Sequence, residues 1–311
     1  RLARDRAGCL FVGVALIFKR KRGGAVSDCP QGAGAAAREA TQPQAARVEK
    51  KRQKRKTRKE DPMKTIAIMI EKGGAGKTTT AAAVAHILAR SHSVLAIDAD
   101  QQGNLSTLFG VDDPEDKGLA ALLESVHGET TVADVAKESP YGLDVIPANG
   151  YLMDTNMEIA ADEQHDQVRR LRDALENSNV AAAYDYVVID CGLLLDMTVL
   201  NALVAADLVV VPVKVGGFEA QALQRIAEQA GQLRALNPCL ELRSFMTMRA
   251  KNKSAEEFEA WLKSYDQVQA FHTTVSRSVM VERASIYQQP VTAYRPGCKA
   301  SKEYVQLTRE I

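Results

Sequence analysis

A short run of glycines, lysines and threonines has the residue types and spacing needed to hold phosphate groups. It reads Glu71-Lys72-Gly73-Gly74-Ala75-Gly76-Lys77-Thr78-Thr79. Glycines let backbone N–H groups approach an anion, while a lysine followed by a threonine supplies a cation for the β- and γ-phosphates and a hydroxyl for Mg²⁺. We expect Lys77 to take the first role and Thr78 the second. The run therefore predicts a phosphate-binding loop formed by residues 72–79.

The loop departs from the strict pattern G-x-x-x-x-G-K-T, because Glu71 holds the place of the first glycine. The variant K-G-G-x-G-K-T-T is met in full and adds a second lysine, Lys72. A glycine-rich linker is the alternative interpretation. The flanking residues oppose it, since 65–70 is a continuous apolar run typical of a buried strand and 80–90 is alanine-rich with helical spacing. Strand, loop and helix follow in the order that directs a helix N-terminus at an anion.

Two further strand ends carry carboxylates. Val94–Ile97 runs into Asp98-Ala99-Asp100, and Tyr186–Ile189 runs into Asp190. Each acid alone could terminate a strand or cap a helix. Because ligands of open α/β sheets bind at the carboxyl ends of the strands, two such ends beside a phosphate loop favour chemistry. We expect Thr78, Asp98 and Asp190 to form the magnesium site, with Asp190 holding the metal through water, and Asp98 or Asp100 to orient the attacking water.

The charge is distributed unevenly along the 311 residues. Residues 1–62 contain no methionine and hold 17 Lys and Arg against 6 Asp and Glu, which leaves 23 basic and 33 acidic residues in 63–311. The basic block 50–59 repels itself and predicts disorder. Three interpretations of 1–62 remain open: upstream sequence included by a wrong start, a nucleic-acid-binding arm, or a targeting segment. The first is favoured. The five cysteines show no C-x-x-C spacing, which fits a reducing cytosol.

Residues 63–311 are long enough for one domain with a sizeable core. Helical and strand patterns alternate, which predicts an α/β fold with a mainly parallel, twisted sheet and helices on both faces. Further strands are expected at 94–97, 143–146, 186–189, 208–211, 240–246 and 270–274, with helices at 218–236 and 255–265.

Together these residues resemble the ParA/MinD family of deviant-Walker P-loop ATPases, most closely its partition (ParA-like) branch. Lys72 matches the family's signature lysine, and Asp98-Ala99-Asp100-Gln101-Gln102-Gly103-Asn104 is similar to its D-x-D-P-Q-G-N motif. Residues 146–149, 201–213 and 290–311 resemble further family stretches. The resemblance implies the P-loop NTPase fold, with ATP and Mg²⁺ as cofactors and ATP hydrolysis as the activity. It also implies that Lys72 contacts the phosphates of a second copy in a sandwich homodimer and that Asp100 serves hydrolysis.

In partition proteins of this kind the ATP-bound dimer grips DNA non-specifically, and a ParB-like centromere-binding partner triggers hydrolysis. The resemblance therefore implies a cytoplasmic, nucleoid-associated protein that moves plasmid, chromosomal or mobile-element DNA. Because residues 63–311 carry excess negative charge, local basic patches must contact the DNA. The candidates are Arg249, Lys251, Lys253, Arg277 and Arg283. A solvated charge run is the alternative interpretation.

Several departures from the family pattern affect hydrolysis and DNA binding. Gln101 replaces a proline, Gly192-Leu193 replaces a proline pair, and Glu71 puts a carboxylate next to the phosphate loop. Met280 stands where a DNA-gripping basic residue is expected. Other possibilities are a MinD-like or other cargo-positioning ATPase, or a scaffold in which ATP sets only dimerisation. The chain shows no basic amphipathic C-terminal helix of the kind that lies on a membrane, so we expect no membrane contact.

Overall fold

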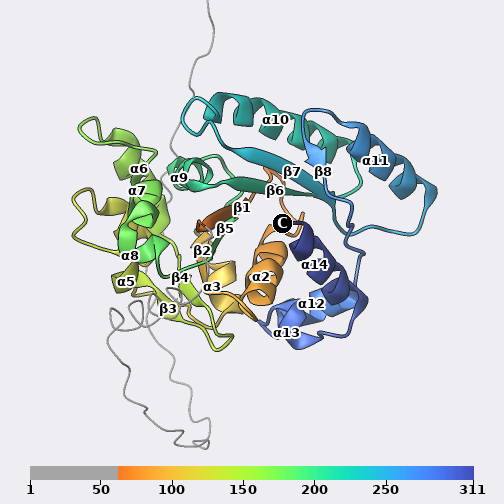
Figure 1. The fold of residues 1–311 in the computed structure, drawn as a ribbon, viewed down its shortest axis with the longest axis horizontal. Helices are drawn as coiled ribbons and strands as arrows, with labels where there is room; N and C mark the ends of the chain where they lie inside the picture. Colours follow the sequence, from red (N-terminus) through yellow and green to blue (C-terminus); the bar gives the residue numbers. More distant parts are fainter. Residues whose placement is uncertain (1–61) are drawn as a thin grey trace, which may run out of the picture. The chain divides into compact units, whose positions relative to one another are not determined.

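The computed structural model describes residues 62–311, and the fold is given for these residues (Figure 1). The strands are β1 Lys64–Ile68, β2 Val94–Ala99, β3 Lys137–Glu138, β4 Asp144–Ile146, β5 Tyr186–Cys191, β6 Leu208–Val213, β7 Glu241–Met246 and β8 Gln269–Ala270. The longer helices are α2 Lys77–Leu88, α6 Tyr151–Ala161, α9 Met197–Ala205, α10 Gly217–Leu233, α11 Lys253–Ser264, α12 Val279–Ile286 and α14 Lys299–Glu310. The shorter ones are α3 Asn104–Leu108, α4 Leu119–Glu124, α5 Val132–Val135, α7 Arg170–Glu176, α8 Ser178–Ala181 and α13 Val291–Tyr294.

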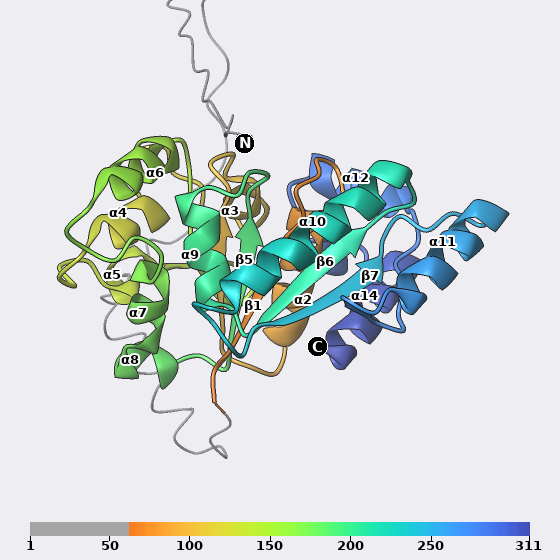
Figure 2. The same cartoon turned by 90° about the horizontal axis from the view of Figure 1, so that it is seen from above.

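The strands form one sheet in the order β3-β4-β2-β5-β1-β6-β7-β8. All neighbours pair in parallel except β3 and β4. Helices α9 and α10 lie on one face of the sheet, and α2 and α14 lie on the other (Figures 1 and 2). The prediction of a mainly parallel α/β sheet with helices on both faces is confirmed.

Alternate strand residues feed two hydrophobic cores. Ile66 and Ile68 of β1 pack with α2, α12 and α14, whereas Ala67 between them packs with α9 and α10 on the opposite face. Successive side chains of a strand point to opposite faces, so a strand covered on both sides must be apolar throughout. This requirement explains the continuous apolar runs in the sequence. It also fixes β1 at the centre of the sheet, where its carboxyl end is surrounded by other strand ends.

The prediction of a strand at 270–274 is wrong beyond its first residue, because β8 is Gln269–Ala270. The backbone N–H groups of His272 and Thr273 donate to the Glu310 carboxylate at 2.7 and 2.9 Å instead of pairing with a strand. The chain pairs with β7 again at Val275, whose N–H donates to the Met246 carbonyl at 2.8 Å, and Ser276 then forms an isolated parallel bridge with Arg249. The two-residue strand β3 was not predicted, because two residues are too few to show alternation.

Within 62–311, none of the helices is both long and apolar enough to cross a bilayer. The prediction that residues 1–62 form a disordered or wrongly included leader falls outside the described residues, apart from Pro62. The boundaries of the single domain expected at 63–311 remain a prediction.

Candidate nucleotide-binding site

The glycine-rich loop connects the carboxyl end of β1 to the first turn of α2. Gly74 and Gly76 have φ angles of 68° and 82°, a left-handed conformation that glycine adopts without steric cost. Gly76 is the N-cap of α2 and provides no side-chain cap for the helix. The N–H groups at this end of the helix are therefore available to an anion, together with the positive end of the helix dipole.

Lys77 and Thr78 begin α2 directly beside the carboxylates of the neighbouring strands. Lys77 is only 9% exposed, and its ammonium lies close enough to Asp190 to lower the pKa of that carboxyl. Thr80 stabilises the first turn of α2. Its hydroxyl donates to the Gly76 carbonyl at 2.7 Å and lies 3.4 Å from the Tyr304 hydroxyl of α14. Helix α14 therefore supports the loop from the face opposite α10.

The carboxylates predicted from the two strand ends are neighbours in the sheet. Asp98 of β2 pairs in register with Asp190 of β5, and both side chains are fully buried. Asp98 accepts three hydrogen bonds, from the Asp100 N–H at 3.2 Å and from the N–H and hydroxyl of Ser106 at 2.8 and 2.7 Å. Burial still raises the pKa of Asp98 to about 6. Its hydrogen bonds fix the turn that carries Asp100 and the start of α3.

Asp190 has the same burial but no hydrogen-bond partner for either carboxylate oxygen among the described residues. Burial and the neighbouring Asp98 raise the pKa of Asp190 well above its usual value, while the nearby Thr78 hydroxyl and Lys77 lower it by less. A buried polar group without a partner is costly, so it usually marks a place where a ligand or ion supplies one. Two free carboxylate oxygens beside a threonine hydroxyl suit Mg²⁺, which binds few protein groups and keeps several waters.

Asp100 lies at the mouth of the site, in the turn after β2. Its Oδ1 accepts the Gln102 N–H at 3.0 Å, and the side chain is only partly buried. Gly192 lies against this turn, since a Cβ added there would be 3.4 Å from the Ala99 carbonyl oxygen and 3.8 Å from the Asp100 Cα. These distances are ordinary van der Waals contacts, so the loop after β5 packs on the Asp100 turn without requiring a glycine there.

The Glu71 side chain, which replaces the first glycine of the strict loop pattern, contacts α10. Its carboxylate accepts a hydrogen bond from the Gln229 side chain at 2.9 Å and lies 3.7 Å from the Arg225 guanidinium, both on α10. The carboxylate beside the start of the phosphate loop is therefore paired with α10. Glu71 anchors the start of the loop to α10.

A pocket of about 410 Å³ adjoins the loop and was missed from sequence. It is bounded by Gly76 and Thr79 on one side and by the segments that follow β6 and β7 on the other, including Lys214, Thr247 and Met248. The signal for these residues is their position, because Lys214 directly follows β6 and Thr247 and Met248 directly follow β7, at the edge of the sheet where ligands bind. A pocket next to the phosphate loop has the place and size needed for the nucleoside part of a nucleotide.

The basic residues proposed for DNA contact lie in two segments that the fold brings together. The Arg249 N–H donates to the Val275 carbonyl at 3.0 Å, and the Arg277 N–H donates to the Arg249 carbonyl at 3.2 Å. The Arg249 guanidinium is committed to Glu259 at 2.7 Å, which reduces its availability. Lys253 keeps a side chain that is 88% exposed.

Lys251 and Arg283, which belong to the same two segments, are exposed. Lys299 of α14 joins this cluster of basic residues by donating to the Ser276 hydroxyl at 2.8 Å. Lys299 was missed, because it joins the cluster only through the tertiary fold. Contact between these basic residues and DNA stays a prediction.

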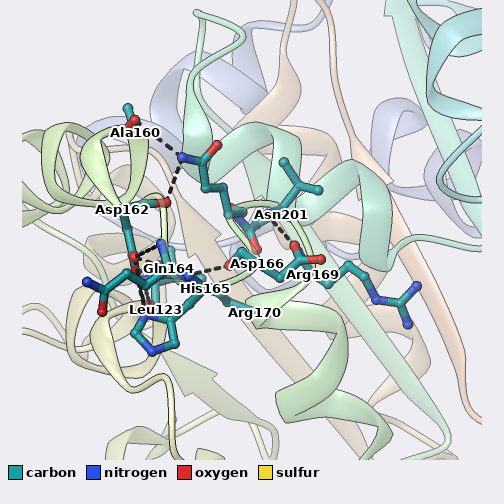
Figure 3. A network of polar contacts seen from close by, with 11 residues as sticks. Leu123, Ala160, Asp162, Gln164, His165, Asp166, Arg169, Arg170 and Asn201 are labelled. Carbon is teal, nitrogen blue, oxygen red and sulfur yellow. Dashed lines mark hydrogen bonds and ion pairs between the residues drawn. The ribbon is translucent and has the colours of Figure 1, made fainter.

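A second polar network lies between α6 and α7, away from the phosphate loop (Figure 3). Asp162 accepts hydrogen bonds from the N–H groups of Gln164 and His165 and from the Arg170 guanidinium, and these contacts lower its pKa to about 2. Asn201 of α9 joins the network by accepting the Leu171 N–H and donating to the carbonyls of Gln167 and Met197. We call these residues (Asp162, Gln164, His165, Gln167, Arg170, Leu171 and Asn201) the α6–α7 network.

Comparison with known proteins places the site in context. Residues 63–242 match a family model described as an AAA domain (AAA_31). The chain is 34% identical over 256 residues to the chromosome partitioning protein ParA of Caulobacter vibrioides, covering 81% of this chain and 94% of that protein.

Two solved structures share the fold. Apo McdA from Cyanothece superposes with a TM-score of 0.70 at 22% identity, over 80% of this chain and 98% of the other. Cobyrinic acid a,c-diamide synthase from Mycobacterium smegmatis, solved with an ATP analogue and magnesium, gives 0.67 at 20% identity, over 79% and 93%. The expected P-loop NTPase fold is therefore confirmed.

Proposed function

The chain belongs to the ParA/MinD family of deviant-Walker P-loop ATPases, and from this premise we propose that it is a magnesium-dependent ATPase that partitions or positions DNA. The observation that carries the enzymatic part is the buried, unpartnered carboxylate of Asp190 beside Lys77 and Thr78. Among residues 62–311 only the nearby Thr78 hydroxyl and Lys77 offset the burial of Asp190, and a hydrated metal bound to a nucleotide would supply the missing partners. The partition role is supported by the 34% identity to a chromosome partitioning protein.

Each side chain of the site has a role in this proposal. Gly74 and Gly76 shape the loop so that its N–H groups face the phosphates, and Lys77 contacts the β- and γ-phosphate oxygens. Bound Mg²⁺ would neutralise developing phosphate charge, with the Thr78 hydroxyl as ligand and Asp190 holding its waters. The hydrogen bonds of Asp98 favour a supporting role for this residue over direct metal contact. Asp100, partly exposed at the mouth, would orient the attacking water.

A homodimer is supported by the distribution of exposed apolar side chains. Eleven of the twelve large apolar side chains exposed within 62–311 follow the carboxyl ends of strands or belong to α12 and its C-cap. Apart from Phe218, which contacts Lys72 of its own subunit, they include Met157, Leu194, Val279 and Ile286. Only Leu236, 44% exposed, lies at the opposite edge, before β7. Apolar surface gathered on the edge that holds the nucleotide suits a second copy closing over it. Lys72 would then contact the partner's phosphates.

The dimer can be tested with a matched pair of substitutions in the full chain. Leu194→Glu places a charge on the nucleotide edge and should abolish dimer formation with a non-hydrolysable ATP analogue, measured by sedimentation. Leu236→Glu introduces the same charge on the opposite edge and should leave the dimer intact. Equal behaviour of the two variants would contradict the proposed interface, and absence of a dimer in the wild type would refute the sandwich itself.

DNA and a ParB-like activating protein are the proposed macromolecular partners, with the cytoplasm and nucleoid as the location. The combined substitution Lys251→Glu with Lys253→Glu should weaken DNA binding uniformly across sequences and reduce the salt dependence by about one unit of slope per lost phosphate contact. The same measurement on a chain lacking residues 1–62 separates the contribution of the basic block. Binding that disappears with 1–62 and ignores the two lysines would overturn this assignment.

A scaffold that binds ATP without turnover is the competing function. Steady-state phosphate release by the full chain, with and without DNA, decides between them. The expected result is magnesium-dependent turnover that is absent in Lys77→Ala. Dimer formation with no turnover under any of these conditions would favour the scaffold.

A further inference from the structure

Three side chains of α10 lie along one stripe of the helix. Phe218, Arg225 and Gln229 are spaced seven and four residues apart, which returns to the same side after two turns and then one. This stripe borders the buried face of α10, so it lies at the edge of the helix that meets the loop after β1. No catalytic motif includes these residues.

The stripe contacts both residues that open the phosphate loop. Glu71 is held by Gln229 at 2.9 Å and by Arg225 at 3.7 Å, while the Lys72 ammonium lies 5.4 Å from the centroid of the Phe218 ring. That distance is within the range of a cation–π interaction. Among residues 62–311, no carboxylate lies within 4.0 Å of the Lys72 ammonium to form an ion pair. The ring of Phe218 is therefore the contact that locates this charge, although the ring itself is 72% exposed.

We propose that Glu71, Phe218, Arg225 and Gln229 form a latch, the α10 latch, that stores the Lys72 side chain against its own subunit until a second copy arrives. The inference rests on the proposed function, in which Lys72 acts on the partner's phosphates. Glu71 positions the backbone of the loop on α10, and Phe218 holds the ammonium. Lys72 must leave this ring in order to act across the dimer.

Lys72 can contact either Phe218 or the phosphates of the partner, and this determines whether removing the ring strengthens or weakens the dimer. A contact made only in the separate subunit stabilises that state and so opposes assembly by its own free energy. Because each of the two subunits must release its ring, removing the ring should strengthen the ATP-dependent dimer by about five- to thirtyfold, twice the free energy of one exposed cation–π contact. A residue that merely supported the fold or the interface would weaken the dimer when it was removed. The sign of the change thus separates the latch from an ordinary structural contact.

The first test observes the stored lysine directly in the nucleotide-free full chain. With isotopically labelled lysine, the side-chain NMR signal of Lys72, assigned by its loss in Lys72→Arg, should show an upfield ring-current shift. Phe218→Leu should abolish this shift while keeping the apolar volume, and Phe218→Tyr should retain it. An unshifted Lys72 signal in the wild-type protein would overturn the proposal.

The second test measures dimer dissociation constants by sedimentation with a non-hydrolysable ATP analogue and Mg²⁺. Phe218→Leu and Glu71→Ala should each tighten the dimer, with nucleotide affinity of the separate subunit unchanged in Phe218→Leu. Gln224→Ala, an exposed change on the same helix away from the stripe, is the control and should have no effect. A weaker or unchanged dimer in Phe218→Leu would refute the latch while leaving the proposed function intact. A wild-type chain that forms no dimer would instead refute the sandwich, and the lysine signal would still decide whether Phe218 holds Lys72.

Discussion

The α6–α7 network and the nucleotide edge both contain acidic and basic side chains held in fixed positions, yet they differ in whether those side chains satisfy one another. In the network, Asp162 accepts several donors and its pKa falls to about 2. At the nucleotide edge, Asp190 is fully buried without a partner and its pKa rises. A satisfied network stabilises the fold, whereas an unsatisfied buried charge marks where a ligand completes the structure. Substitutions should therefore lower the stability of the protein in the α6–α7 network, whereas replacing Asp190 at the nucleotide edge should raise the stability of the nucleotide-free protein.

The largest effect should come from Lys77→Ala at the nucleotide edge. The change removes charge-assisted contacts to two phosphate groups, so ATP affinity should fall by about a hundredfold or more, measured by fluorescent-nucleotide titration. Lys72→Ala should keep the affinity of the separate subunit and lose the dimer, because its proposed contact is made in trans. If both variants lose subunit affinity equally, Lys72 acts within its own subunit.

Asp100→Ala should produce the next largest change. Turnover should fall by about ten- to a thousandfold, the range for losing a residue that positions water or accepts a proton, while ATP affinity and dimer formation persist. Turnover and melting temperature should be measured on the same preparation. Lower melting temperature with unchanged turnover would mean that Asp100 only caps the turn before α3.

Arg170→Ala tests the satisfied region. The guanidinium side chain is 8% exposed and donates to the Leu123 and Asp166 carbonyls and to Asp162. Its loss leaves two partly buried acceptors, Asp162 and the Leu123 carbonyl, without this donor, so unfolding free energy should fall by about 1 to 3 kcal/mol, measured by urea denaturation. Nucleotide affinity at temperatures where the variant is folded should not change. A selective loss of nucleotide affinity would show that the two regions are coupled.

Asp190→Asn should have the smallest effect on stability and the opposite sign. A carboxyl whose pKa is raised in the folded state binds more protons there than in the unfolded chain, so it lowers stability as pH rises from the unfolded pKa near 4 to the folded pKa. Replacing it should therefore stabilise the nucleotide-free protein at pH 7, and by less at pH 4. Magnesium-dependent ATP binding should weaken at the same time. If Asp190→Asn destabilised the protein at pH 7, Asp190 would be a residue that stabilises the fold and not one kept for a ligand.

Asp98 adds a second pH-dependent contribution to the same edge. Its folded pKa of about 6 means that stability of the nucleotide-free protein falls as pH rises between about 4 and 6. Asp162 behaves in the reverse manner, since its stabilising contribution is present above the unfolded pKa and is lost as pH falls toward 2. Unfolding curves of Asp190→Asn over pH 4–8 should therefore lose the contribution of Asp190 and retain that of Asp98.

The chain's own pattern was sufficient for the sheet, the phosphate loop and the strand-end acids, because these are local features. A buried parallel strand needs a continuous apolar run, a tight loop needs glycines such as Gly74 and Gly76, and acids after strand ends follow from the position at which ligands meet a sheet. The same pattern could not indicate that Asn201, recognised as part of a family stretch, ties α9 to the α6–α7 network. That role depends on residues about thirty positions away.

The tertiary structure alone decided what each charged side chain does. Asp98 and Asp190 follow equivalent strands and are equally buried, but Ser106 satisfies only Asp98. From the sequence, Glu71 is only a carboxylate in the place of a loop glycine, and the structure supplies its partners, Arg225 and Gln229 of α10. Sequence determined where the acids and lysines stand along the sheet, because apolar periodicity and glycine conformation act locally. Their hydrogen bonds, burial and pKa values depend on which distant segments pack beside them, and only the folded chain specifies that.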